Sequence, residues 1–213
     1  MAGTFREIDL AGWKRAMHCQ IFRNHLLPQY AVSFELDVTA FRRMAKAAGY
    51  SFTLAMIYTV TRCAGEIEEF RYRFLDGKVV LYDTIDTAFA YLNPETELFK
   101  FVAVPMQPSL AGYVALARHT AATQEAYFTG PPANDVFIFS PLPWVSFTHV
   151  SHTDSGKKEQ AAPMFDWGKF FDRGGRTILP FSVQVHHSFV DGIHIGKLAD
   201  RLQRRLDAAS AGD

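Results

Sequence analysis

Hydrophobic and polar positions change their spacing several times along the chain, and each change predicts a different element. Between residues 13 and 23 the large apolar side chains recur at a spacing close to one helical face, which predicts a helix. Residues 30–38 alternate strictly between apolar and polar, as in a strand with one buried face. Thr39 can act as the N-cap of a following helix, and Gly49 can end that helix.

The middle of the chain mixes long and short apolar segments. Residues 52–70 predict a long core helix, and Asp76-Gly77 predicts the tight turn of a β-hairpin. Strands are expected at residues 87–92 and 98–104, followed by a helix of about five turns at residues 109–128. Helical and extended segments therefore alternate instead of forming separate blocks.

The last third of the chain predicts strands again and then one more helix. Strands are expected at residues 135–139 and 144–150, and Arg173-Gly174-Gly175 is expected to join two further strands. Asp191 is expected to open a C-terminal helix. Its inward face would consist of Ile193, Ile195, Leu198, Leu202 and Leu206. We predict an α+β two-layer sandwich, a single domain over residues 1–213, in which helices pack on one large mixed sheet.

Composition narrows the possible functions. Lys plus Arg equals Asp plus Glu at 22 each, so no net positive charge favours nucleic acid as a partner. The start of the chain has no basic region followed by an apolar one, and no segment approaches the roughly 20 apolar residues of a membrane span. We expect a cytoplasmic protein without membrane contact. Cys19 and Cys63 fit no metal-ligand spacing, and we interpret both as small buried hydrophobic residues.

Candidate chemistry is concentrated between Gln184 and His194, where the last predicted strand meets the last predicted helix. A histidine at a strand end can act as a general base, because its ordinary pKa lies near neutrality. His187 is the candidate. A structural interpretation is also open: Asp191 would only cap the helix while the pair His186-His187 packs at a sheet edge.

Several short segments distributed over residues 5–206 carry a resemblance to a known family. They are Trp13-Lys14-Arg15, Phe70-Arg71, Asp76-Gly77, Pro94-Glu95-Thr96-Glu97, Pro143-Trp144-Val145-Ser146-Phe147-Thr148, Ala162-Pro163, Lys169 and the run from Leu179 to Gly192. In order and spacing they resemble the chloramphenicol acetyltransferases. The His-His-x-x-x-Asp-Gly element alone also occurs in dihydrolipoyl acyltransferase cores and in peptide-synthetase condensation domains. The Pro-Trp-Val-Ser-Phe-Thr run favours the stand-alone acetyltransferase.

The resemblance implies an activity and an assembly. His187 would take a proton from an acceptor hydroxyl, which then attacks the thioester of the cosubstrate acetyl-CoA. Asp191 would pair with Arg15 and hold the catalytic loop. The family forms homotrimers with active sites at the subunit interfaces, so His187 of one subunit would face pocket residues of its neighbour. No metal is expected.

The same resemblance places an acceptor pocket. It would be lined by Ile21, Phe22, Leu26, Tyr30 and Phe99. Such aromatic and aliphatic walls suit a small, largely apolar acceptor such as chloramphenicol. Each of these residues could equally belong to a hydrophobic core.

Two positions depart from the family pattern. His149 stands where the family has a serine that stabilises the oxyanion, and Asp166 stands where it has a threonine. Three functions therefore stay open: an O-acyltransferase that uses His149 as the donor, a rebuilt pocket in which His149, Asp166 and His187 perform different chemistry, and a non-catalytic ligand-binding homologue. A metal site is a further alternative. His149 and His152 lie three residues apart, and on a strand their side chains would face opposite ways. If His152 curls back, His149, His187 and Asp166 would approach the two-histidine, one-carboxylate pattern of a metal site.

Overall fold

The computed structural model describes residues 3–130, 132–153, 156–157 and 159–209. Its helices are α1 (Ala16–Arg23), α2 (Thr39–Ala47), α3 (Phe52–Gly65), the short 3-10 helix η1 (Glu68–Phe70), α4 (Leu110–Thr123) and α5 (Gly192–Asp207). Its strands are β1 (Phe5–Glu7), β2 (Gln29–Asp37), β3 (Tyr72–Leu75), β4 (Lys78–Tyr82), β5 (Asp86–Asn93), β6 (Leu98–Val104), β7 (Val136–Phe139), β8 (Met164–Trp167), β9 (Phe171–Arg173) and β10 (Arg176–His186). Within these ranges, no helix is both long and apolar enough to cross a membrane.

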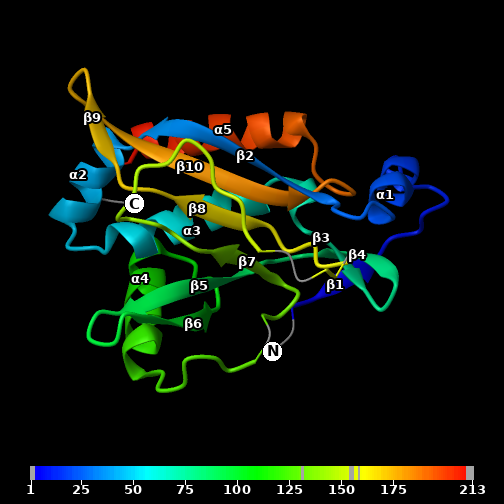
Figure 1. The fold of residues 1–213 in the computed structure, drawn as a ribbon, viewed down its shortest axis with the longest axis horizontal. Coiled ribbons are helices and arrows are strands. Elements are labelled where there is room, and N and C mark those ends of the chain that lie inside the picture. Colours follow the sequence, from blue (N-terminus) through cyan, green and yellow to red (C-terminus); the bar gives the residue numbers. More distant parts are fainter. Residues whose placement is uncertain (1–2, 131, 154–155, 158, 210–213) are drawn as a thin grey trace.

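A seven-stranded mixed sheet organises the molecule. Its order is β2-β10-β8-β7-β5-β6, with β9 paired to β10. The pairs β5–β7 and β7–β8 are parallel, and the other pairs are antiparallel. A second sheet, β1-β4-β3, lies beside it toward α1 (Figure 1). The α+β prediction with one large mixed sheet is confirmed, because α3, α4 and α5 cover one face of that sheet (Figure 1).

Strand β10 shows how the two faces of the sheet differ. Leu179, Phe181, Val183 and Val185 alternate along it and are buried in the main hydrophobic core. Ser182 and Gln184 point to the other face, where the segment between β7 and β8, yellow-green in Figure 1, crosses the sheet. One side of the strand therefore holds the core together, and the other presents polar side chains.

Several predicted elements are confirmed. The alternating segment at residues 30–38 is β2, and the last two strands are joined at Arg173-Gly174-Gly175. Asp76 and Gly77 form the β3–β4 turn with φ of 49° and 77°, as a two-residue hairpin of this type requires. Cys19 and Cys63 are free and buried.

Several boundaries differ from the prediction. Thr39 is the first residue of α2 and not its cap; the Asp37 carboxylate accepts hydrogen bonds from its N–H and its hydroxyl. The helix at 52–70 ends at Gly65, and the separate 3-10 turn η1 follows after Ile67, which is extended. The helix at 109–128 ends at Thr123, because Gln124 is extended. Ile193 is exposed, since it lies two residues from the buried Ile195 and points to nearly the opposite side of the helix.

The strand predicted at residues 144–150 is wrong. The segment crosses the outer face of the sheet, where the Val145 carbonyl accepts the N–H of Lys169 at 2.8 Å. A Cβ on Gly168 would lie 2.6 Å from that carbonyl oxygen, so the glycine permits the close approach. No sheet edge is available for this segment beside β7, because β5 and β8 already occupy both sides of β7.

Candidate active site

His187 lies directly after β10. Its backbone N–H donates to the Pro28 carbonyl at 2.9 Å, which extends the pairing with β2 by one residue. The N–H groups of Phe189 and Val190 then bond the His186 carbonyl, so the chain turns and α5 begins at Gly192. This junction fixes the backbone on both sides of the candidate base.

Two aromatic rings and a carboxylate hold the His187 side chain. Phe22 stacks on its imidazole with centroids 3.8 Å apart and planes 11° from parallel, and the Tyr30 ring lies at 4.7 Å. Nδ1 is buried and lies 3.2 Å from Asp191 Oδ1, but it makes no well-oriented hydrogen bond with a described residue. Because the side chain is 36% exposed, Nε2 is the ring nitrogen open to a reactant.

Arg15 and Asp191 form a bidentate ion pair beneath this histidine. Arg15 Nη1 and Nη2 donate to the two Asp191 carboxylate oxygens at 2.6 and 3.0 Å. The same guanidinium lies 3.4 Å from the carbonyls of Ser188 and His187. Arg15 is buried rather than a surface residue. Its hydrogen bond holds the pKa of Asp191 below its usual range, so the carboxylate is charged at neutral pH.

His194 is a supporting residue that the sequence analysis did not assign. Its Nδ1 accepts the backbone N–H of Asp191 at 2.9 Å, and its Nε2 lies 3.4 Å from Glu69 Oε1. This pattern places the proton of the neutral ring on Nε2. Burial lowers the pKa of His194, which favours that neutral form. Its place three residues after the helix cap is the signal that could have identified it.

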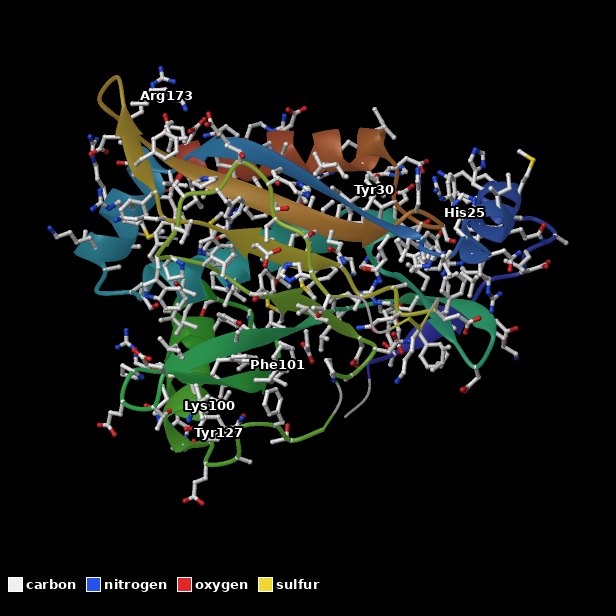
Figure 2. All side chains as sticks on the ribbon, in the orientation of Figure 1. His25, Tyr30, Lys100, Phe101, Tyr127 and Arg173 are labelled. Atoms are coloured by element: carbon white, nitrogen blue, oxygen red, sulfur yellow. The ribbon has the colours of Figure 1, made fainter. Side chains whose placement is uncertain are left out.

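The five predicted pocket residues do not converge in one chain. Phe22 and Tyr30 contact His187, whereas Ile21 and Leu26 are exposed on α1 and the turn after it. Phe99 lies on β6 and packs against Phe128. Figure 2 labels Tyr30 and Phe101, which mark the His187 end of β2 and the β6 edge, and they lie in separate parts of the molecule.

Asp166 belongs to a different location on the sheet. It is fully buried on β8, opposite Ser182 of β10, and its Oδ2 lies 2.7 Å from His152 Nε2. Burial raises the pKa of Asp166, while the histidine opposes that effect. Ser182 precedes His187 by five residues, or roughly 16 Å along an extended strand. Asp166 and His187 of one chain therefore do not share a reacting centre.

Asp166 contacts His152 and not His149, which the rebuilt-pocket alternative places beside it. His149 is exposed in the segment that crosses the sheet. Because this segment is not a strand, His152 can fold onto the sheet face without following strand alternation. No three His, Cys, Asp or Glu side chains of the described ranges are grouped so that they could hold a metal ion.

Comparisons with known proteins agree along nearly the whole chain. A family model described as chloramphenicol acetyltransferase matches residues 3–203. Chloramphenicol acetyltransferase 2 of Escherichia coli is 32% identical over 208 residues, which cover 96% of this chain and 98% of that protein. A chloramphenicol acetyltransferase of Streptomyces acrimycini is 33% identical and covers 93% of each. A solved chloramphenicol acetyltransferase structure has a TM-score of 0.86 at 30% identity, covering 95% of this chain and all of the other.

Proposed function

This chain belongs to the chloramphenicol acetyltransferase family, and we propose that it transfers the acetyl group of acetyl-CoA to a hydroxyl of a small, largely apolar acceptor such as chloramphenicol. His187 is the general base of this proposal. One observation carries it: the imidazole is clamped between Phe22 and Tyr30 with Nδ1 buried against Asp191, so that only its Nε2 edge is available. An imidazole whose ring is fixed and which has one open nitrogen suits proton abstraction.

The proposed reaction needs one base and no metal. His187 Nε2 takes the proton of the acceptor hydroxyl as its oxygen attacks the thioester carbonyl carbon. The tetrahedral intermediate carries negative charge on the former carbonyl oxygen. When that carbonyl re-forms, the carbon–sulfur bond breaks, and the imidazolium returns its proton to the CoA thiolate. Asp191 stabilises the transient imidazolium, and Arg15 keeps Asp191 charged and in place.

The proposal includes a homotrimer whose active sites lie between subunits. Two observations support it. Asp166 lies roughly 16 Å along the sheet from His187 of the same chain, and Phe99 lies on β6, at the sheet edge opposite β2. Large apolar side chains near α1 are exposed, namely Met17, Ile21, Leu26 and Leu27, and such a patch is typical of an interface. Three chains of 24.0 kDa would sediment as one species of about 72 kDa; a monomer at working concentration would exclude the shared site.

The decisive test compares His187→Ala with the wild type in a thiol-release assay with acetyl-CoA and chloramphenicol. We expect a loss of at least about 100-fold in kcat, as is typical for removal of a general base. His119→Ala is the matched control, because His119 is exposed on α4. A His187→Ala variant that keeps more than about a tenth of the wild-type rate would remove the base from this mechanism.

A rebuilt pocket with different chemistry is the second candidate. The buried pair of Asp166 and His152 favours it, because the family pattern has a neutral threonine at the position of Asp166. The two candidates differ in their need for CoA. Calorimetric titration with acetyl-CoA should give binding if the chain is an acetyltransferase, and turnover without any acyl-CoA would support the rebuilt site.

We also propose a cytoplasmic location and a contribution to antibiotic resistance, which drug susceptibility of expressing cells would test.

A further inference from the structure

Helix α1 carries Phe22, the ring that stacks on His187, but this helix buries little of its own surface. Cys19 is buried, and the other residues of α1 are half-buried or exposed. The helix has eight residues and lies at one end of the molecule, beyond the ends of β2 and β10 (Figure 1). A helix this short depends on contacts with the rest of the protein for its stability. Such contacts therefore decide how firmly Phe22 is held 3.8 Å from the imidazole.

Arg23, the last residue of α1 and the neighbour of Phe22, supplies several of these contacts. Its Nε donates to Glu159 Oε1 at 3.0 Å, and its Nη2 donates to the same oxygen. Nη2 also donates to the Gly77 carbonyl at 2.8 Å. The guanidinium carbon lies 4.6 Å from the centroid of the Phe74 ring. One side chain therefore connects the end of α1 to the β3–β4 turn and to the segment between β7 and β8.

Tyr30, the second ring beside His187, is connected to the same segment. Gln29 precedes Tyr30 on β2, and Gln29 Nε2 donates to the Gln160 carbonyl at 2.7 Å. Glu159 and Gln160 follow one another in the sequence. Two consecutive residues of one segment thus bind the chain neighbours of both rings. This arrangement fixes the end of α1 relative to the start of β2.

We propose that Arg23 and Gln29 are positioning residues for the reaction, because residues 159–160 hold both of them and thereby space the two rings around His187. We call residues 159–160 the brace. This inference rests on the proposed function, in which His187 is the base. Arg23 and Gln29 act through the rings beside them and not on the reacting atoms. A base displaced by about 1 Å can lose on the order of 100-fold in rate, so loosening the rings should lower kcat.

Arg23→Met tests the contact between α1 and the brace. Methionine removes the guanidinium and keeps an apolar side chain over Phe74. In the thiol-release assay with acetyl-CoA and chloramphenicol, kcat should fall about 10-fold to 100-fold, with a much smaller change in the KM for acetyl-CoA. The side chains of Arg23 and Glu159 are 25% and 44% exposed, so loss of their ion pair should change the melting temperature little. Arg23→Lys keeps a donor for Glu159 and should retain more activity than Arg23→Met.

Arg173→Met is the matched control for the arginine. Arg173 donates two hydrogen bonds to the Glu35 carboxylate at 2.6 and 2.8 Å, and its guanidinium carbon lies 5.1 Å from the Phe171 centroid. These are the same two kinds of contact that Arg23 makes. Figure 2 shows Arg173 at the opposite end of the molecule from His25, which follows α1. Arg173→Met should therefore keep the wild-type kcat, and equal losses in the two methionine variants would refute the inference.

A mutant cycle in kcat shows whether Arg23 and Glu159 act as a unit. Glu159→Gln should lower kcat less than Arg23→Met, because Arg23 keeps its contact with Gly77. The double variant should have the kcat of Arg23→Met alone, since both substitutions break the same ion pair. Losses that multiply in the double variant would show that the ion pair does not position the site.

Gln29→Leu tests the contact between β2 and the brace, with Gln184→Leu as its control. Gln184 Nε2 donates to Gln29 Oε1 at 2.7 Å. Gln29→Leu removes this hydrogen bond and the one to Gln160, whereas Gln184→Leu leaves the one to Gln160 in place. A loss of kcat that is larger in Gln29→Leu supports the inference, and equal losses in the two variants contradict it.

His187→Ala, measured in the same assay, separates the inference from the proposed function. If His187→Ala is inactive and Arg23→Met has the kcat of Arg173→Met, the base stands and the positioning role is wrong. If His187→Ala keeps the wild-type rate, the proposed function fails and the inference fails with it.

Discussion

The ion pair between Arg15 and Asp191 gives the strongest prediction for the folded state. We consider Arg15→Met and Asp191→Asn, singly and together. Methionine retains much of the apolar stem of arginine, so the substitution removes mainly the guanidinium. The pair connects the start of α1 to the start of α5 and also bears on the His187 and Ser188 carbonyls. Loss of the pair should therefore lower both the free energy of unfolding and the catalytic rate.

The expected loss of unfolding free energy depends on how deeply the Arg15–Asp191 pair is buried. Breaking a fully buried ion pair costs about 3–5 kcal/mol, because one charge is left without a partner. The Arg15 side chain is 8% exposed and that of Asp191 is 30% exposed, so solvent offsets part of this cost. We expect each single variant to lose about 2–4 kcal/mol of unfolding free energy, or about 4–16 °C in melting temperature for a chain of this size. The double variant should lose less than the sum of the two, with a coupling of about 2 kcal/mol.

The assay is denaturant unfolding of all four proteins at one protein concentration, because oligomer stability depends on concentration. The folded-state pKa of Asp191 lies below its ordinary 3.8. Its contribution is therefore fully present above that ordinary value and is lost as the pH falls through the lowered one. The coupling should be present at pH 7 and should shrink at pH 3. Losses that add within about 0.5 kcal/mol at pH 7 would show that the two residues are energetically independent.

Two further predictions concern residues around the site. Burial holds the pKa of His194 below its ordinary 6.5, so the contribution of His194 to stability should be present above pH 6.5 and lost as the pH falls through its folded-state pKa. His194→Gln should weaken this dependence of the unfolding free energy on acid pH. An unchanged pH dependence would contradict the assignment. Gly168→Ala would place a Cβ 2.6 Å from the Val145 carbonyl oxygen and should lower the free energy of unfolding by about 1–3 kcal/mol. Gly196 has open space around it on α5, so Gly196→Ala should raise the free energy of unfolding by about 0.5–1 kcal/mol. Equal melting temperatures for these two variants would exclude the close approach.

Short local patterns in the sequence were enough to predict β2 and the turn between β3 and β4. The alternation at residues 30–38 identified β2, and Asp76-Gly77 identified a turn that requires positive φ. The sequence also predicts a strand at residues 144–150, but a strand needs a neighbouring edge, and β7 is already paired on both sides. Pairing of that kind is a property of the whole sheet and cannot be found in a short window of sequence.

The candidate site also has a part that the sequence could predict and a part that it could not. His187, Asp191 and Arg15 could be named from the sequence, because the resemblance carried them as a set, and the structure brings the three together. The partner of Asp166 could not be named, because it depends on how an irregular segment crosses the sheet. A carboxylate on a central strand has to find a hydrogen bond there, and a histidine fourteen residues away supplies it. Because strand alternation does not constrain that segment, His152 can reach Asp166 while His149 stays exposed. The two departures from the family pattern therefore do not contact each other: Asp166 pairs with His152, and His149 lies exposed nearby in the sequence.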